Sequence, residues 1–82
     1  MTYKELDTVV LTRDLPEHGL KAGDLGAVVL VSPASGTLEV EFVRASGQTQ
    51  AVVTLAIDFV RPVQDEDLIA VRRVPPNTGG AA

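Results

Sequence analysis

The chain has 82 residues and no cysteine; 45% of its residues are hydrophobic, but only 4% are aromatic. This length suits one domain with a single aliphatic core, and the lack of cysteine excludes disulfides, thiolate catalysis and cysteine-based metal sites. Seven basic and eleven acidic residues give a formal net charge of -4. Because nucleic-acid binding depends on neutralising phosphates, we expect no nucleic-acid partner.

No apolar run approaches the roughly 20 residues of a membrane-spanning helix. Residues 1–5 have neither the basic start nor the apolar stretch of a signal peptide. We therefore expect no membrane partner and a cytoplasmic location.

The first predicted element is Thr8–Thr12, a short run of β-branched and aliphatic residues that favours a strand. In the stretch that follows, Pro16 and Gly19 disfavour the continuation of a strand or helix. We expect a long irregular loop, held against the domain by the apolar side chains of Leu15 and Leu20.

The next feature is a polar loop that contains Gly23, Asp24 and Gly26 and leads straight into a valine-rich strand. We interpret these three residues as a structural turn. Asp24 is expected to accept hydrogen bonds from nearby backbone amides, and Gly26 to stand where only a hydrogen atom fits. A Walker-type phosphate loop is not favoured, because that loop ends in Gly-Lys-Ser/Thr and opens into a helix.

The strand predicted from Gly26 to Ser32 lacks alternation, since Ala27 to Val31 are all apolar. Successive side chains of a strand point to opposite faces, so both faces of this strand need cover. In a small barrel one face fills the interior. The outer face must then be covered by the C-terminal segment, by another copy of the chain or by a different protein.

Residues 37–42 follow a turn and alternate cleanly between apolar and polar side chains, which predicts a strand. The inward residues are Leu38, Val40 and Phe42, and the outward residues are Glu39 and Glu41. The two glutamates share one face. We interpret them as solubilising charges that can also steer a basic partner, and not as a catalytic carboxylate pair.

A fourth strand is predicted at Thr49–Leu55, in which Ala51 to Val53 are again apolar on both faces. Ala56-Ile57-Asp58 is compatible with a single helical turn. Residues 59–62 predict a short closing strand, which Pro62 terminates or places at a sheet edge.

The composition changes beyond Pro62. Residues 64–74 start with acidic residues, continue with an apolar run and carry Arg72 and Arg73 near their end. This charge order suits a short helix, whereas the spacing of the apolar residues suits a sixth strand, which we favour. Either element would cover an exposed apolar face of the barrel.

These boundaries divide the chain into three parts. We expect a barrel at residues 1–63, a covering segment at residues 64–74 and a disordered tail at residues 75–82.

Catalytic chemistry has little support in the sequence. His18 is the only histidine and lies beside Glu17 in the first loop. Nucleophilic catalysis or a transition-metal site would need further groups that converge on this histidine, and the sequence does not supply them. We interpret His18 as a solvated loop side chain, and we expect no enzyme activity, metal or cofactor.

Several motifs resemble, in their order along the chain, a family of small bacterial proteins known only as a domain of unknown function. The motifs are Leu6-Asp7-Thr8-Val9-Val10-Leu11, Asp14-Leu15-Pro16-Glu17, Gly19-Leu20, Gly23-Asp24-Leu25-Gly26-Ala27-Val28-Val29, Val40-Glu41-Phe42, Val53-Thr54-Leu55 and Val60-Arg61-Pro62. The resemblance covers residues 5–63 and implies an all-β fold: a small SH3-like barrel of five short antiparallel strands. It implies no activity and no site residues.

The Gly-Asp-x-Gly-x-Val turn is also similar to the turns of other SH3-like barrels. These include a photosystem accessory subunit, the variable chain of ferredoxin-thioredoxin reductase and the barrel of the nitrile hydratase β subunit. Such proteins are non-catalytic or helper portions of larger assemblies, and this resemblance implies a similar class of role.

The leading hypothesis is a non-enzymatic protein-binding accessory module. Its predicted partner-binding residues are Val29, Val31, Glu39, Glu41 and Val52. A sharper version is an antitoxin or immunity protein that covers a basic toxin. The alternative is a structural module that assembles with copies of itself, and a third hypothesis is a helper subunit of an enzyme or electron-transfer complex.

Overall fold

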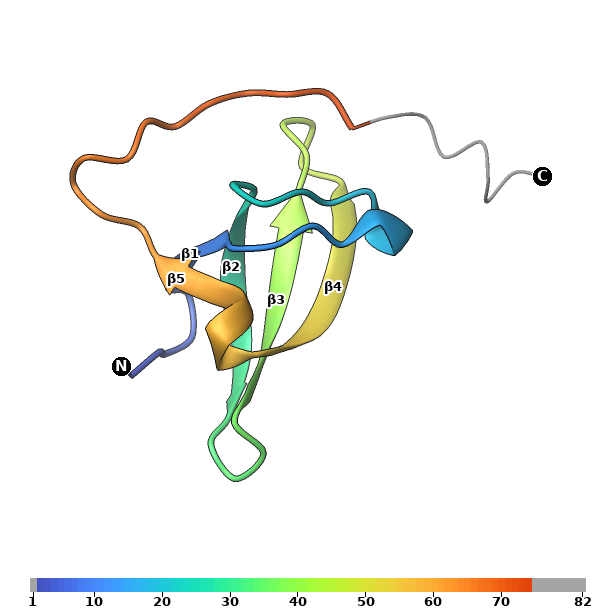
Figure 1. Cartoon of the computed structure of the whole chain (residues 1–82). Coiled ribbons are helices and arrows are strands. Elements are labelled where there is room, and N and C mark those ends of the chain that lie inside the picture. The colour runs from blue at the N-terminus through green and yellow to red at the C-terminus, as the bar shows by residue number, and fades with distance from the viewer. Residues whose placement is uncertain (1, 75–82) are drawn as a thin grey trace.

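The computed structural model describes residues 2–74, which form one five-stranded antiparallel β-sheet (Figure 1). The strands are β1 (Thr8–Leu11), β2 (Leu25–Ser32), β3 (Thr37–Val43), β4 (Thr49–Ala56) and β5 (Val60–Pro62). Two short 3-10 helices accompany them, η1 (Pro16–His18) and η2 (Ile57–Phe59). The predicted all-β class with five antiparallel strands is confirmed. The predicted tail at residues 75–82 lies outside the described residues.

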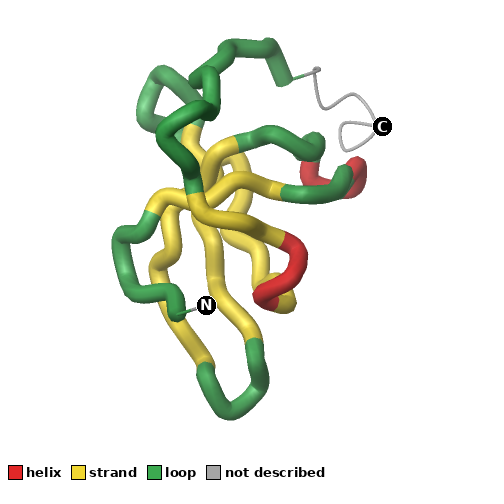
Figure 2. The backbone as a smooth tube through the Cα atoms, turned by 60° about the vertical axis from the view of Figure 1, so that its left-hand side comes forward, coloured by secondary structure: helices red, strands yellow, loops and turns green. Residues whose placement is uncertain are grey.

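The sheet curls on itself in the manner of a small barrel. Its strand order is β4-β3-β2-β1-β5, so β4 and β5 stand at opposite ends. Yet Leu55 of β4 and Val60 of β5 belong to the same buried cluster, and only η2 separates the two strands along the chain. The tube view in Figure 2 shows the strands wrapping around a common interior.

The interior is aliphatic apart from one phenylalanine and receives side chains from every strand. Its buried members are Val9, Leu11, Leu15, Leu20, Val28, Leu38, Val40, Phe42, Leu55 and Val60. The three inward residues predicted for β3 are confirmed, since none is more than 2% exposed. Burying one such side chain stabilises a fold by about 1.5–3 kcal/mol, so this cluster is the main support of the barrel.

A β-bulge interrupts β2 and decides which of its side chains face inward. Val28 lies opposite Val40, but Leu30 and not Val29 lies opposite the next residue of β3. After this extra residue, Val31 pairs with Leu38 and packs against the core. The prediction that Val31 belongs to the outer surface is therefore wrong, because the bulge reverses the facing of every later residue in the strand.

The first loop is anchored as predicted. Leu15 and Leu20 are 8% and 3% exposed and form an isolated β-bridge through two backbone hydrogen bonds of 2.9 and 3.1 Å. Between them, Pro16 starts η1, a position at which the missing proline N–H costs nothing. From β4, the Gln50 side chain donates a 3.0 Å hydrogen bond to the backbone oxygen of His18.

Residues 63–74, here called the strap, form neither a strand nor a helix. Both structures considered from the sequence, the sixth strand and the short helix, are wrong for this segment. A turn closes from the Asp67 amide to the Gln64 oxygen at 3.0 Å, and beyond it the strap arches across the top of the molecule in Figure 1. Leu68 and Val71 are 93% and 96% exposed, so no apolar burial drives regular structure here.

Among the described residues, no helix combines the length and apolar character needed to cross a membrane.

Candidate functional site

The first candidate surface is the outer face of β2, β3 and β4. The strand register aligns Ala27, Glu41 and Val52 in one row across the three strands. A second row aligns Leu30, Glu39 and Thr54. The face thus alternates apolar residues with a central line of two carboxylates.

We call five residues of this face the outer patch: Val29, Leu30, Glu39, Glu41 and Val52. The three apolar members are 38%, 43% and 52% exposed, and the two glutamates are half-buried. Four of the five predicted partner-binding residues are therefore brought together on one face, and Val31 is not. Leu30 was missed, because only the bulge beside it turns its side chain outward.

One carboxylate of the outer patch is held in place from the neighbouring strand. The Thr49 hydroxyl of β4 donates a hydrogen bond to Glu41 Oε2. A restrained carboxylate loses less conformational freedom when a cation pairs with it. Glu41 is thus better prepared for such pairing than a free surface glutamate.

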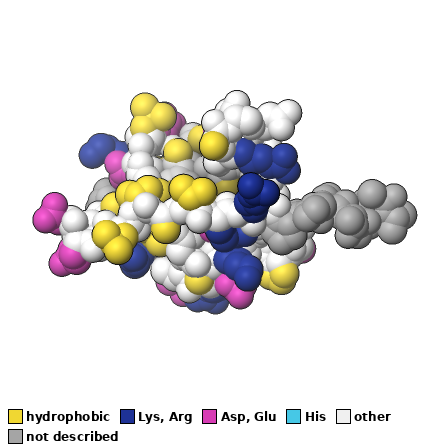
Figure 3. Space-filling model, turned by 90° about the horizontal axis from the view of Figure 1, so that it is seen from above, with side chains coloured by type: hydrophobic (Ala, Val, Ile, Leu, Met, Phe, Trp, Pro, Cys, Tyr) yellow, Lys and Arg dark blue, Asp and Glu magenta, His cyan; other side chains and the backbone are white. Residues whose placement is uncertain are grey.

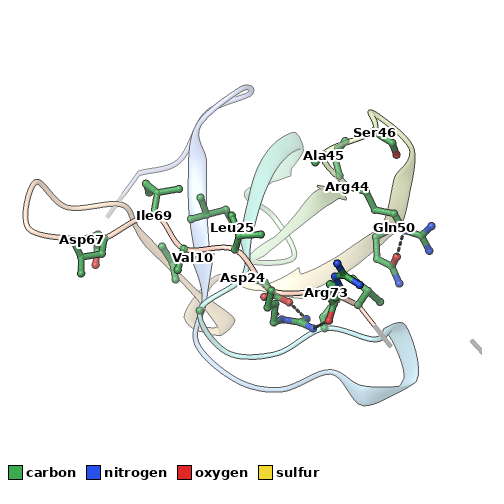
Figure 4. Close-up of a pocket in the computed structure, with 18 of the residues that line it drawn as sticks. Val10, Asp24, Leu25, Arg44, Ala45, Ser46, Gln50, Asp67, Ile69 and Arg73 are labelled. Carbon is green, nitrogen blue, oxygen red and sulfur yellow. Dashed lines mark hydrogen bonds and ion pairs between the residues drawn. The ribbon is translucent and has the colours of Figure 1, made fainter. Parts of the chain in front are cut away.

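The second candidate surface is a groove of about 940 Å³ between the strap and the barrel. Its apolar barrel side includes Val10, Leu20 and Leu25, and the strap closes the other side (Figure 4). Ile69 of the strap lies over Val10 and Leu25 in this view. The strap therefore crosses β1 and the start of β2, and it leaves Val29 and Leu30 exposed.

One end of the strap is fastened to the glycine-flanked turn through Asp24. Arg72 Nε donates a 2.9 Å hydrogen bond to Asp24 Oδ1, and a terminal guanidinium nitrogen of Arg72 pairs with Oδ2. The same guanidinium donates to the Gly19 backbone oxygen at 3.0 Å. This two-pronged ion pair joins residues 48 positions apart.

Asp24 also closes its own turn, as predicted: its Oδ2 accepts a 2.8 Å hydrogen bond from the Lys21 amide. Partial burial acts to raise the pKa of Asp24, but the hydrogen bonds from Arg72 and Lys21 outweigh it and hold the pKa below its ordinary value. In return, the hydrogen bond to Asp24 raises the pKa of Arg72.

The other end of the strap is fastened to β5. Arg61 donates two hydrogen bonds, of 2.9 and 2.8 Å, to the two carboxylate oxygens of Asp67. The Gln64 amide adds a third at 2.6 Å. These donors, with Arg61 contributing most, lower the pKa of Asp67 to about 2.

Both glycines of the turn have the predicted roles. Gly23 adopts a φ of 98°, a left-handed conformation that side-chain-bearing residues avoid. A methyl group on Gly26 would stand 2.5 Å from Val40 Cγ1 and 2.9 Å from Phe42 Cε2. Only glycine fits there without displacing the core.

Residues 5–62 match the family described as Domain of unknown function (DUF4926). The chain belongs to this family. The sequence resemblance to a family of unknown function is thereby confirmed. No curated protein and no solved structure matches the chain.

The DUF4926 match ends at Pro62, the last residue of β5, so the strap lies outside it. The matched region contains the whole barrel and the whole outer patch. It also contains Arg61 and Asp24, whose side chains form the two ion pairs with the strap.

Within residues 2–74 of this DUF4926 protein, no group of three or more histidine, cysteine or acidic side chains could hold a metal ion. His18 is half-buried, and its backbone oxygen accepts the Gln50 hydrogen bond described above. It does not line the groove beneath the strap. The geometry thus brings no catalytic partner to this histidine among the described residues.

Proposed function

We propose that this DUF4926 protein is a non-enzymatic module that binds a basic protein through the outer patch. The observation that carries the proposal is the arrangement of Val29, Leu30 and Val52, each more than a third exposed, around two half-buried glutamates. Protein interfaces combine such apolar anchors with a few well-placed charges.

The two kinds of side chain have separate roles in this proposal. The apolar residues lose water contact when a partner covers them, at about 25 cal/mol for each Å² of apolar surface buried, and this supplies affinity. Glu39 and Glu41 attract a cationic partner, which raises the association rate and fixes orientation. An arginine of the partner suits this site best, because its planar guanidinium group can donate two hydrogen bonds to one carboxylate and pack over aliphatic side chains.

The net charge of -4 supports a basic partner, since it favours encounter with a positively charged protein over the whole surface. In its sharpest form, the proposal describes an antitoxin or immunity protein of the cytoplasm that covers a basic toxin.

The test is calorimetric titration with the product of the adjacent gene. The double variant E39K/E41K should bind about 100-fold more weakly than the wild type, which corresponds to about 2.7 kcal/mol. The control is E5K/E17K, which changes the net charge equally at two exposed positions outside the outer patch. It should keep most of the affinity.

Thermal unfolding of both double variants verifies that the fold is unchanged. Absence of any complex with the wild type would overturn the proposal. So would equal weakening by both double variants, because a general charge effect would then explain the binding.

A further inference from the structure

The backbone N–H and C=O groups of the strap are largely unpaired. Within the described residues, residues 68–74 make no backbone–backbone hydrogen bond and belong to no β-ladder. Unpaired N–H and C=O groups along an extended segment are a template for pairing with another strand. The strap therefore offers a strand edge without a partner.

The exposed side chains of the strap also favour pairing with a second segment. Leu68, Ile69 and Val71 are 93%, 67% and 96% exposed, although all three are large and apolar. In Figure 3, which looks down on the strap, apolar side chains form a row across the middle of the molecule. Pairing with a second extended segment would bury them.

The charges of the strap make it complementary to itself. Its first part contains the acidic run Asp65-Glu66-Asp67, and its last part contains Arg72 and Arg73. Two straps in antiparallel orientation bring the acidic end of each beside the basic end of the other. A parallel pair would place like charges side by side and is disfavoured.

We propose that a second copy of this chain docks on the strap, the two straps running antiparallel about a two-fold axis near Ala70. This arrangement places Ile69 opposite Val71 of the second copy, and it brings the turn that contains Glu66 close to Arg73 of the second copy. The contact is isologous: each copy contributes the same residues, so the assembly closes as a dimer. The surface is separate from the outer patch, and the dimer does not rest on the proposed function.

The two ion pairs of the strap prepare it for this contact. Arg61 with Asp67 fixes one end, and Asp24 with Arg72 fixes the other. A segment already held in an extended form loses less conformational entropy when it pairs. Arg73 and Glu66 are exposed and belong to neither ion pair, so they are available to the second copy.

The experiment is a charge exchange read out as mass in solution by sedimentation equilibrium. We expect a wild-type dimer at about 100 µM protein, the range of a modest interface. Glu66→Arg and Arg73→Glu should each weaken dimerisation at least about ten-fold, because each places like charges together at both ends of the strap pair. An equimolar mixture of the two variants should recover the dimer, and so should the double variant E66R/R73E.

Recovery in the mixture is the decisive result, since neither unfolding nor a general charge effect would produce it. Ile69→Asp, at an exposed position, should also give a monomer. Three outcomes would overturn the inference: a wild-type monomer at about 1 mM protein, dimers unaffected by either single exchange, and failure of the mixture to recover. The variant E39K/E41K should leave the dimer unchanged, which separates this inference from the proposed function.

Discussion

The barrel and the strap are held in place by different forces. The barrel combines a five-stranded antiparallel sheet with a cluster of ten buried apolar side chains, which include Val40 at 0% exposed. The strap has no ladder and no buried apolar residue, and two arginine–aspartate pairs hold it at its ends. The barrel therefore defines the fold, whereas the strap can detach while the barrel stays folded.

This difference has thermodynamic consequences. Apolar burial is almost independent of salt and pH, whereas ion pairs near the surface weaken with salt and with protonation of the carboxylate. Exposed ion pairs contribute about 0–1 kcal/mol each. The strap is therefore expected to detach under mild changes that leave the barrel folded.

The largest expected effect contrasts two leucines, one from each region. Leu38 is 1% exposed in the core, and Leu68 is 93% exposed on the strap. Leu38→Ala should lower the free energy of unfolding by about 2–5 kcal/mol, through lost burial and the cavity left behind. Leu68→Ala should change it by less than about 0.5 kcal/mol. Urea unfolding of both variants measures the contrast, and similar losses in the two would contradict it.

A smaller effect is expected at Asp24, which serves both regions. Asp24→Asn keeps an oxygen that can accept the Lys21 amide but removes the charge that binds Arg72. The strap end should be released, while the free energy of unfolding falls by about 1 kcal/mol or less. Asp24→Ala removes both interactions and should cost more.

Chemical shifts of the Val74 amide report the release of the strap. They should move in both Asp24 variants and stay in place in an Asp58→Asn control, which removes an exposed carboxylate on η2. Unchanged Val74 shifts in Asp24→Asn would show that the ion pair does not hold the strap.

The smallest expected effect is the response of the strap to acid. The pKa of Asp67 is lowered to about 2, below its value of about 3.9 in an unfolded chain. A lowered pKa means that the ion pair contributes fully above about pH 4 and is lost as the pH falls through about 2. The carboxyl carbon shift of Asp67 should titrate near pH 2, and a midpoint near pH 4 would show that Arg61 does not bind it.

The sequence predicts the barrel well where its signals are local. The alternation in β3 correctly assigns the inward residues, because the period of side-chain facing in a regular strand is exactly two. The Gly-Asp-x-Gly turn correctly assigns Gly26, since the glycine precedes a strand that packs against the core. Leu15 and Leu20 are the only large apolar residues of their loop, and both are buried.

The errors arise where a local pattern carries no information. In β2 every residue from Ala27 to Val31 is apolar, so either set of alternate side chains could face the core. The sequence therefore does not reveal the bulge at Val29 or the inward position of Val31. In the strap, the charge order is compatible with a helix dipole. Its arginine instead binds Asp24, 48 residues away along the chain, and this distant partner keeps the segment extended.

Backbone hydrogen exchange tests the distinction between barrel and strap most directly. It is best measured on Arg73→Glu, in which strap pairing between copies is weakened. The amides of β3, a central strand, should exchange only through global unfolding, whereas the amides of residues 68–74 should exchange at nearly the rates of an unstructured peptide. Protection of the strap amides equal to that of β3 would contradict the distinction, because it would require a backbone ladder that holds the strap as firmly as the barrel.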